Sequence, residues 1–310
     1  DLKFIDGDKN IRFNNGQADS TIVREAVALR IWRALGYPAP RTSFAKTQSN
    51  VWDTEVRVGA FTAHVMVETY KKAFFKRSVP TAVHVWEGSG DPFDGGWYDT
   101  ECQWTDEDDC DDLALGEIVA AVEAVPLGNG FMQATADVID WPRIHDNQCI
   151  SALTGTGDDW IHNNNNVVLV LREDGKLMYL PYSTDISGNH PWYQDVQYEG
   201  GAYLTRACLS DEECRTAALD RCEQIIDAFE ALDVPTNIVG ERCDALDDAG
   251  LKRAPDGPVC TKMASWYANR PDDVREQLQS IRDGGAGGAG GIDGGVDGMD
   301  GAADGIWLPD

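Results

Sequence analysis

The chain has 310 residues, of which 42% are hydrophobic, so it is long enough to form one large domain or two modest domains around a substantial core. It carries 53 acidic and 26 basic residues and a formal net charge of −27. This charge disfavours binding to nucleic-acid backbones, which requires a positive surface, and favours a solvated acidic surface, cations or a basic partner. Because the sequence contains no run of about 20 apolar residues, we expect no membrane span.

The N-terminal part predicts strands around a single helix. Alternating apolar residues predict strands within 1–15, 42–48 and 56–68. Apolar residues at helical spacing predict a helix over 22–35, which Gly36 ends. This segment therefore reads as a small β-rich unit.

A basic cluster follows, which is unusual in so acidic a chain. It consists of Lys71, Lys72, Lys76 and Arg77. The cluster either guides a phosphate-bearing or acidic ligand or is an ordinary solvated helix face, and the sequence does not separate these alternatives. Residues 88–112 then form a loop rich in Gly, Asp and Trp.

The rest of the chain predicts helices and one hairpin. We expect the helices at 113–124, 131–153, 211–231 and 271–282. A polar segment at 154–166 precedes the hairpin, whose strands VVLVLRE and KLMYLPY flank the turn Asp174-Gly175.

The C-terminal tail, residues 284–310, differs from the rest in composition. It is rich in Gly, Asp and Ala and cannot form a hydrophobic core. We expect a flexible linker or an attachment segment through which the protein self-assembles. Its repeated Asp-Gly pairs are also weakly similar to calcium-binding repeats, so a structural calcium ion is a further alternative.

The eight cysteines predict disulfide bonds and an oxidising compartment, hence an extracellular or cell-surface protein. Cys102 and Cys110 bracket an acidic loop that we expect to be stapled, whereas the full connectivity stays open. A structural zinc site is the alternative, although histidines are few. Since the chain starts at Asp1 with a strand-like segment and shows no signal peptide, we expect it to be processed from a longer precursor.

One constellation of residues has the pattern that phosphoryl transfer requires. A carboxylate orients the attacking hydroxyl, amide and carboxylate oxygens hold magnesium or manganese, and a cation pairs with the phosphates. Asp158 and Asp159 each precede an asparagine by five residues, at Asn163 and Asn164, and the hairpin leads to Asp185. The alternative is a polar turn before a hairpin, where Asp and Asn are common.

Three stretches of the sequence resemble the CotH family of secreted, kinase-like spore-coat proteins. They are IRFNNGQADSTIVREAVALRIWRALGYPAPRTSFAK at 11–46, VRVGAFTAHVMVETYKKAFFKR at 56–77 and DDWIHNNNNVVLVLREDGKLMYLPYSTDISG at 158–188. Each motif is loose, but their order and spacing together are fairly specific. The resemblance runs from about residue 11 to 230.

The resemblance implies an α+β, atypical protein-kinase-like fold within residues 1–283. A small β-rich N-terminal lobe would cover about 1–85 and a larger helical lobe about 113–283, and the protein would be disulfide-bonded. It also implies a metal-dependent kinase that uses ATP with Mg²⁺ or Mn²⁺ to phosphorylate hydroxyls of secreted or surface proteins.

The resemblance assigns roles by position. Asp159, or Asp158 in the other register, would be the catalytic carboxylate. Asn164 or Asn166, together with Asp185, would bind the metal. The residues expected to contact the nucleotide or support its site are Arg24, Glu68, Lys71 and Lys72.

The sequence departs from the family pattern in two places. The family's PWDLD block is here Pro181–Asp185, which keeps one of its two acidic residues. No clear phosphate-binding lysine is present, so Lys3, Arg12 and Lys46 are all candidates. An alternative function therefore stands beside the kinase: a non-catalytic extracellular structural or adhesion protein that keeps the fold and assembles through its tail.

Overall fold

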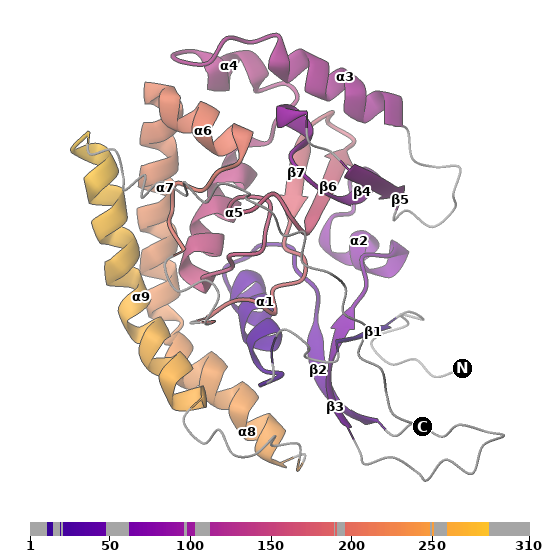
Figure 1. Ribbon diagram of the computed structural model, residues 1–310, viewed down its shortest axis with the longest axis vertical. Coiled ribbons are helices and arrows are strands. Elements are labelled where there is room, and N and C mark those ends of the chain that lie inside the picture. Colours follow the sequence, from indigo (N-terminus) through magenta and orange to yellow (C-terminus); the bar gives the residue numbers. More distant parts are fainter. Residues whose placement is uncertain are drawn as a thin grey trace, which may run out of the picture.

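The computed structural model describes residues 11–14, 19, 21–47, 62–95, 98–102, 112–188, 190, 196–248, 250 and 259–284. Two small antiparallel sheets lie on one side of the molecule, and the long helices lie on the other (Figure 1). The mixed α/β class expected from the sequence is confirmed. The predicted attachment or calcium-binding role of the tail falls outside the described residues.

The first sheet has three strands in the order β1-β3-β2, with bounds β1 Ile11–Asn14, β3 Thr62–Glu68 and β2 Thr42–Thr47. The second sheet has the order β5-β4-β6-β7, with bounds β5 Tyr98–Cys102, β4 Ala82–Ser89, β6 Val167–Arg172 and β7 Leu177–Leu180. The β6–β7 pair is the hairpin that the sequence predicts. Strands β4 and β5 were not predicted. Strand β5 lies within residues 88–112, whose composition is that of a loop, whereas β4 lies mostly before that segment.

The described α-helices differ widely in length, from 5 residues in α4 to 24 residues in α9. Their bounds are α1 Arg24–Ala34, α2 Lys72–Ser78, α3 Asp112–Glu123, α4 Phe131–Thr135, α5 Trp141–Thr154, α6 Tyr203–Ser210, α7 Glu212–Ala231, α8 Glu241–Asp248 and α9 Val259–Arg282. A 3-10 turn covers Pro92–Asp94, and a π-helical segment covers Val234–Gly240. No helix in the described ranges is long and apolar enough to cross a bilayer.

Two helices differ from their predicted bounds. The single helix expected at 131–153 is divided into α4 and α5, because Asp140 accepts a hydrogen bond from the Arg143 amide and Pro142 occupies the first turn of α5. Helix α9 begins well before residue 271 and continues through Pro271. A proline inside a helix removes one backbone donor, which is why the sequence predicted a start there.

One hydrophobic cluster joins the first sheet to the long helices. It includes Val65 on β3, Phe74 on α2, Ile150 on α5, Ile226 on α7 and Leu278 on α9. A second cluster lies beneath the other face of the four-stranded sheet, between β6, α3 and α6. The predicted division into lobes at about 1–85 and 113–283 stays a prediction, since the first cluster contains residues of both.

The predicted disulfides are confirmed for six of the cysteines. Their pairs are Cys149–Cys222, Cys208–Cys214 and Cys243–Cys260, which join α5 to α7, α6 to α7 and α8 to α9. The stapled loop expected between Cys102 and Cys110 lies largely outside the described residues. Beside the second pair, burial lowers the pKa of His145 to about 4, so its imidazole is neutral at pH 7.

Trp160 fixes the polar segment before β6 to the core. Its indole stacks on Tyr179 with ring centroids 3.9 Å apart, and its Nε1–H donates to Asn147 Oδ1 at 2.7 Å. We expect Trp160→Ala to lower the free energy of unfolding by about 3–5 kcal/mol, because a large buried ring and its hydrogen bond are lost. Denaturant unfolding measures this loss. Leu127→Ala, at an exposed side chain, is the control and should stay within about 0.5 kcal/mol of wild type.

Candidate functional site

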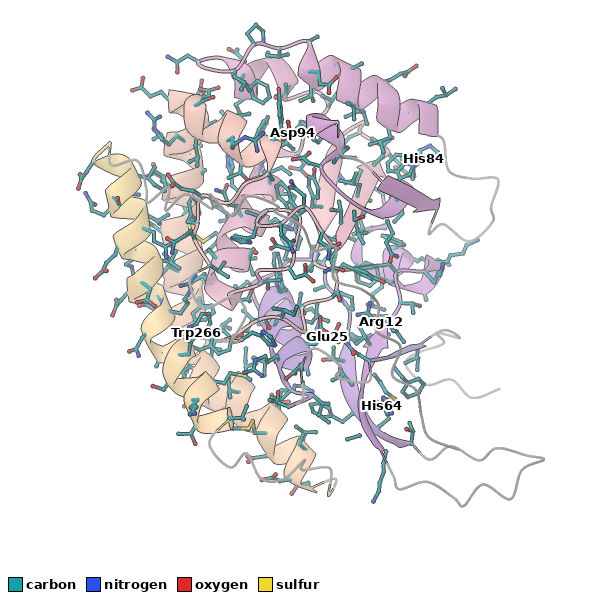
Figure 2. All side chains as sticks on the ribbon, in the orientation of Figure 1. Arg12, Glu25, His64, His84, Asp94 and Trp266 are labelled. Atoms are coloured by element: carbon teal, nitrogen blue, oxygen red, sulfur yellow. A yellow bond between two sulfur atoms is a disulfide. The ribbon has the colours of Figure 1, made fainter. Side chains whose placement is uncertain are left out.

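A buried carboxylate on α1 lies next to a cation on β1. Arg12 Nη2 is 2.6 Å from Glu25 Oε1, and Asn14 Nδ2 donates to Glu25 Oε2 at 2.8 Å. Arg12 and Asn14 share one face of β1, because side chains two residues apart in a strand point the same way. Burial raises the pKa of Glu25, and the charge of Arg12 partly offsets that rise. Figure 2 shows Arg12 and Glu25 near the centre of the molecule.

Asn14 links this pair to the segment after β7. Its Nδ2 lies 3.5 Å from Asp185 Oδ2, while Ser183 Oγ donates to Asp185 Oδ1 at 3.2 Å. Burial raises the pKa of Asp185, and the hydrogen bonds from Asn14 and Ser183 act against that rise. The site therefore holds two desolvated carboxyl groups, Glu25 and Asp185, near a single guanidinium.

The Asp158 segment lies beside the Asp185 segment. The Gly157 amide donates to the carbonyl of Ile186 at 3.4 Å, and the Gly188 amide donates to the carbonyl of Thr154 at 2.9 Å. Two regions that are nearly 30 residues apart in the sequence thus run side by side. The structure thus places the segment just before Asp158 beside the segment that follows Asp185.

Three asparagines surround the carboxylate of Asp158. Asn163 Nδ2 and Asn165 Nδ2 donate to Oδ1 at 2.5 and 2.9 Å, and Asn166 Nδ2 donates to Oδ2 at 2.9 Å. A carboxylate offers about four lone-pair positions, so one remains for a further donor. The half-buried Asp158 carboxylate is therefore held in place by hydrogen bonds and can still accept one more.

Asp159 is engaged differently. Its Oδ1 accepts from the amides of Ile161 and His162 at 3.0 Å each and lies 2.8 Å from His162 Nδ1, and its Oδ2 accepts from Ser151. Although burial acts to lower it, the Asp159 carboxylate raises the pKa of His162 above its ordinary value. Asp159 is a buried residue whose hydrogen bonds shape its own loop.

Asn164 and Asn166 both adopt left-handed backbone conformations, with φ of 56° and 51°. Asparagine tolerates this region better than other non-glycine residues, which explains an asparagine-rich sequence here. The Asn164 carbonyl accepts from the Gly90 amide at 2.5 Å, which joins the loop to the end of β4. Asn164 Oδ1 is buried and has no hydrogen-bond partner within the described part of the chain.

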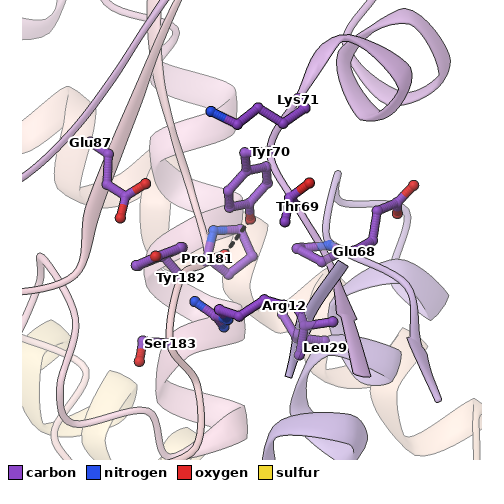
Figure 3. Close-up of a pocket in the computed structure, with 12 residues that line it drawn as sticks. Arg12, Leu29, Glu68, Thr69, Tyr70, Lys71, Glu87, Pro181, Tyr182 and Ser183 are labelled. Carbon is purple, nitrogen blue, oxygen red and sulfur yellow. Dashed lines mark hydrogen bonds between the residues drawn. The ribbon is translucent and has the colours of Figure 1, made fainter. Parts of the chain in front are cut away.

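A pocket opens between the two sheets (Figure 3). Its walls include Arg12, Glu87, Tyr182 and residues 67–71, and its empty space including the open mouth is about 440 Å³. The guanidinium of Arg12 lies 4.8 Å from the centre of the Tyr182 ring. The Tyr70 hydroxyl donates to the carbonyl of Pro181, and both residues line the pocket (Figure 3).

Glu68, the last residue of β3, lines this pocket and makes ion pairs with two arginines. Its carboxylate is 3.0 Å from Arg41 Nη2 and 2.6 Å from Arg77 Nη1, and the Arg41 amide donates to it at 3.0 Å. Although burial acts to raise it, these hydrogen bonds lower the pKa of Glu68 below its ordinary value. Glu68 is therefore an ionised residue that joins β2, β3 and α2.

The remaining predicted residues are separated by the fold. Arg24 Nη1 pairs with Asp19 Oδ1 at 3.0 Å, at the start of α1. Lys71 lines the pocket, whereas Lys72 is on the exposed face of α2. The basic cluster is thus divided between the pocket wall and a solvated helix face.

Sequence reasoning missed Glu25 and Asn14 and left Arg12 as one candidate among three. Two signals were available. Arg12 and Asn14 alternate with the apolar residues of β1, and Glu25 occurs at helical spacing with Ile22 and Leu29 on the buried face of α1. A charged residue on a buried helix face requires a partner, and the strand just before it supplies one.

A protein-family model described as CotH kinase protein matches residues 3–239. The chain belongs to the CotH kinase family. No curated protein matches the chain. Among solved structures, the chain is similar to one described as the Shewanella oneidensis MR-1 toxin–antitoxin system HipA, HipB and its operator DNA complex, with 12% sequence identity and a TM-score of 0.39. The match covers 88% of this chain and 60% of that chain.

In this CotH protein the donor set suits a hard divalent cation rather than a soft one. Asn164 Oδ1 is a buried acceptor without a partner in the described ranges, and the Asp185 carboxylate is a second oxygen donor of the predicted set. Mg²⁺ is usually held by one or two protein oxygens together with phosphate oxygens and water. The residues present therefore fit such a metal, and they leave most of its coordination positions to a ligand.

The raised pKa of Asp185 has a defined consequence for stability. A carboxyl whose folded pKa lies above its unfolded pKa binds protons more tightly when folded, so stability falls as pH rises through these two values. We expect Asp185→Asn to raise the free energy of unfolding at pH 7 by about 1 kcal/mol, since it removes a desolvated charge. Denaturant unfolding at several pH values measures this gain.

The gain should shrink below about pH 4, where wild-type Asp185 is protonated in both states. Glu117→Gln, at an exposed position of α3, is the matched control and should leave the free energy of unfolding unchanged at every pH. A loss of stability in Asp185→Asn at pH 7 would contradict the dominance of desolvation at this residue.

Proposed function

We propose that this CotH protein is a kinase that transfers the γ-phosphoryl group of ATP, with Mg²⁺ or Mn²⁺, to hydroxyl groups of secreted or surface proteins. The observation that carries this proposal is the chain of contacts from Arg12 through Glu25 and Asn14 to Asp185. Protein kinases need a cation paired with a glutamate on a neighbouring helix and a metal-binding aspartate beside it. Here an arginine takes the place of the lysine.

The same proposal includes a kinase-like arrangement of two lobes. The first sheet with α1 would form the small lobe, and the second sheet with the long helices would form the large one. ATP would lie in the pocket between the sheets, with its base toward the backbone of residues 67–71 and its phosphates toward Arg12. A guanidinium suits phosphate because its planar donors form paired hydrogen bonds with phosphate oxygens.

Asp158 is the carboxylate that we propose for the substrate hydroxyl. Its three amide donors hold it oriented, and one lone-pair position stays open. The sequence favoured Asp159, but that carboxylate already accepts from Ser151, His162 and two backbone amides. Asp159 would act by shaping the loop, and Asn164 with Asp185 would hold the metal.

A secreted location is part of the proposal. Three disulfides are typical of proteins in oxidising compartments, and the acidic surface suits basic protein substrates. If the kinase is secreted, its protein substrates also lie outside the cytosol.

The first test separates Asp158 from Asp159. The purified protein is incubated with labelled ATP and Mn²⁺, and label incorporated into the chain or into a basic acceptor protein is counted. We expect Asp158→Asn to lower the rate by about 10²-fold or more while the protein stays folded, because the hydroxyl loses its general base. Asp159→Asn should lower the free energy of unfolding by about 1–3 kcal/mol, because its amide side chain cannot accept all the donors that the carboxylate accepts.

Asp174→Asn, at the exposed hairpin turn, serves as the control for a lost surface carboxylate. If the folded wild-type protein neither binds ATP nor transfers phosphate, the kinase proposal fails, and the non-catalytic surface protein becomes the better account.

The second test concerns Arg12. We expect Arg12→Met to weaken ATP binding by at least about 10-fold, because the phosphates lose their cation and the buried Glu25 loses its partner, and Arg12→Lys to restore part of the affinity. Isothermal titration with ATP and Mg²⁺ measures the affinity. Lys46→Met removes an exposed cation from the same sheet and should leave it unchanged. Equal losses in the Met variants of Arg12 and Lys46 would show that only overall charge matters.

A further inference from the structure

A second cluster of chemically active side chains contains none of the residues that line the pocket between the sheets. His145 on α5 faces the disulfide between Cys208 on α6 and Cys214 on α7. All three residues are buried, and their ligand atoms lie within 4.8 Å of one another. Nothing in the proposed phosphoryl transfer uses them.

The distances from His145 Nε2 to the two sulfur atoms match those expected if all three atoms bound one metal ion. Its Nε2 lies 3.4 Å from Cys214 Sγ and 3.6 Å from Cys208 Sγ. Around a tetrahedral ion with metal–sulfur bonds of about 2.3 Å and a metal–nitrogen bond of about 2.0 Å, nitrogen and sulfur are about 3.5 Å apart. Thus a metal would leave the imidazole where it is and would require only that the two sulfurs separate.

We propose that, when the Cys208–Cys214 disulfide is reduced, His145, Cys208 and Cys214 bind one thiophilic d10 cation, zinc(II) or copper(I). The inference is independent of the proposed kinase activity. Thiolate and imidazole ligands select these soft or borderline ions over Mg²⁺ and Ca²⁺. Because the three ligands come from α5, α6 and α7, the metal would cross-link the same helices that the disulfide and its imidazole contact bring together.

The chemistry balances with a dithiol as reductant. The dithiol gives two electrons and two protons to the disulfide and becomes a disulfide itself, so the sulfur–sulfur bond breaks and two thiols form. Metal binding then releases both thiol protons to solvent and forms two metal–sulfur bonds and one metal–nitrogen bond. The cross-link would therefore persist before oxidation as a metal site and after oxidation as a covalent bond.

The two ions differ in what else they need. Zinc(II) usually takes four ligands, so a water would complete its shell, whereas a three-ligand set satisfies copper(I). Within the described residues the group contains three protein ligands. Separate zinc and copper arms of one experiment distinguish the two ions.

The test measures metal bound per chain. The full chain is reduced with a water-soluble phosphine under anaerobic conditions, dialysed against zinc(II) or copper(I), and analysed for metal, while circular dichroism confirms that it stays folded. We expect one ion per reduced wild-type chain in at least one arm and none in the oxidised chain. His145→Leu should weaken binding by more than about 10-fold, and Cys208→Ser/Cys214→Ser should abolish it.

The matched control is Cys243→Ser/Cys260→Ser, which removes the α8–α9 disulfide and leaves the His145 cluster intact. It should bind as wild type does. If phosphine unfolds the chain, the protein is instead produced in a reducing cytoplasm with added metal, and thermal melting with and without that metal is compared. The proposal is overturned if the folded reduced chain binds neither ion, or if removing His145 or the two sulfurs leaves binding unchanged.

Discussion

The buried carboxylate of Glu25 is the interaction on which the rest of the site depends. An ionised group without a partner in an apolar region is very costly, so Glu25 requires Arg12 and Asn14 to occupy fixed positions. Those two side chains in turn fix β1 against α1, and Asn14 reaches the Asp185 segment. One helix residue thus sets the distance between the first sheet and the loop after β7.

Three polar residues of the site have strained backbone conformations. Asn164, Asn166 and Ser183 all have positive φ, and all three contact or adjoin the proposed reacting groups. Residues in this region persist only when the surrounding structure holds them, which Trp160 and the Asp158 hydrogen bonds do here. Under the proposed function, a preformed loop of this kind would need less reorganisation on binding a metal and phosphate.

The parts of the fold that follow local rules were predictable. The hairpin, α1 and α7 were found because periodicity, a turn signal and helix-ending residues occur within a few residues of each other. The order Asp158, Asn163 and Asp185 was visible for the same reason. Strand β5 was missed because it lies in a segment whose composition is that of a loop, and β4 was missed although it pairs with β6, about 80 residues away in the sequence.

The choice between Asp158 and Asp159 shows where sequence reasoning ends. Both precede an asparagine by five residues, so spacing alone treats them as equals. The contact that local spacing does not show comes from another element: Ser151 on α5 donates to Asp159, in addition to the local amides of 161 and 162. Arg12 and Glu25 likewise became a pair only when β1 was placed against α1.

The hydrophobic cluster that reaches from Val65 to Leu278 has a consequence for how the molecule opens. Since the first sheet and α9 share one apolar interior, neither can detach without exposing the other to water. A ligand bound between the two sheets would therefore also stabilise α9 against local unfolding. Amide protons in α9 would exchange more slowly with solvent when the pocket is filled, although no residue of that helix lines it.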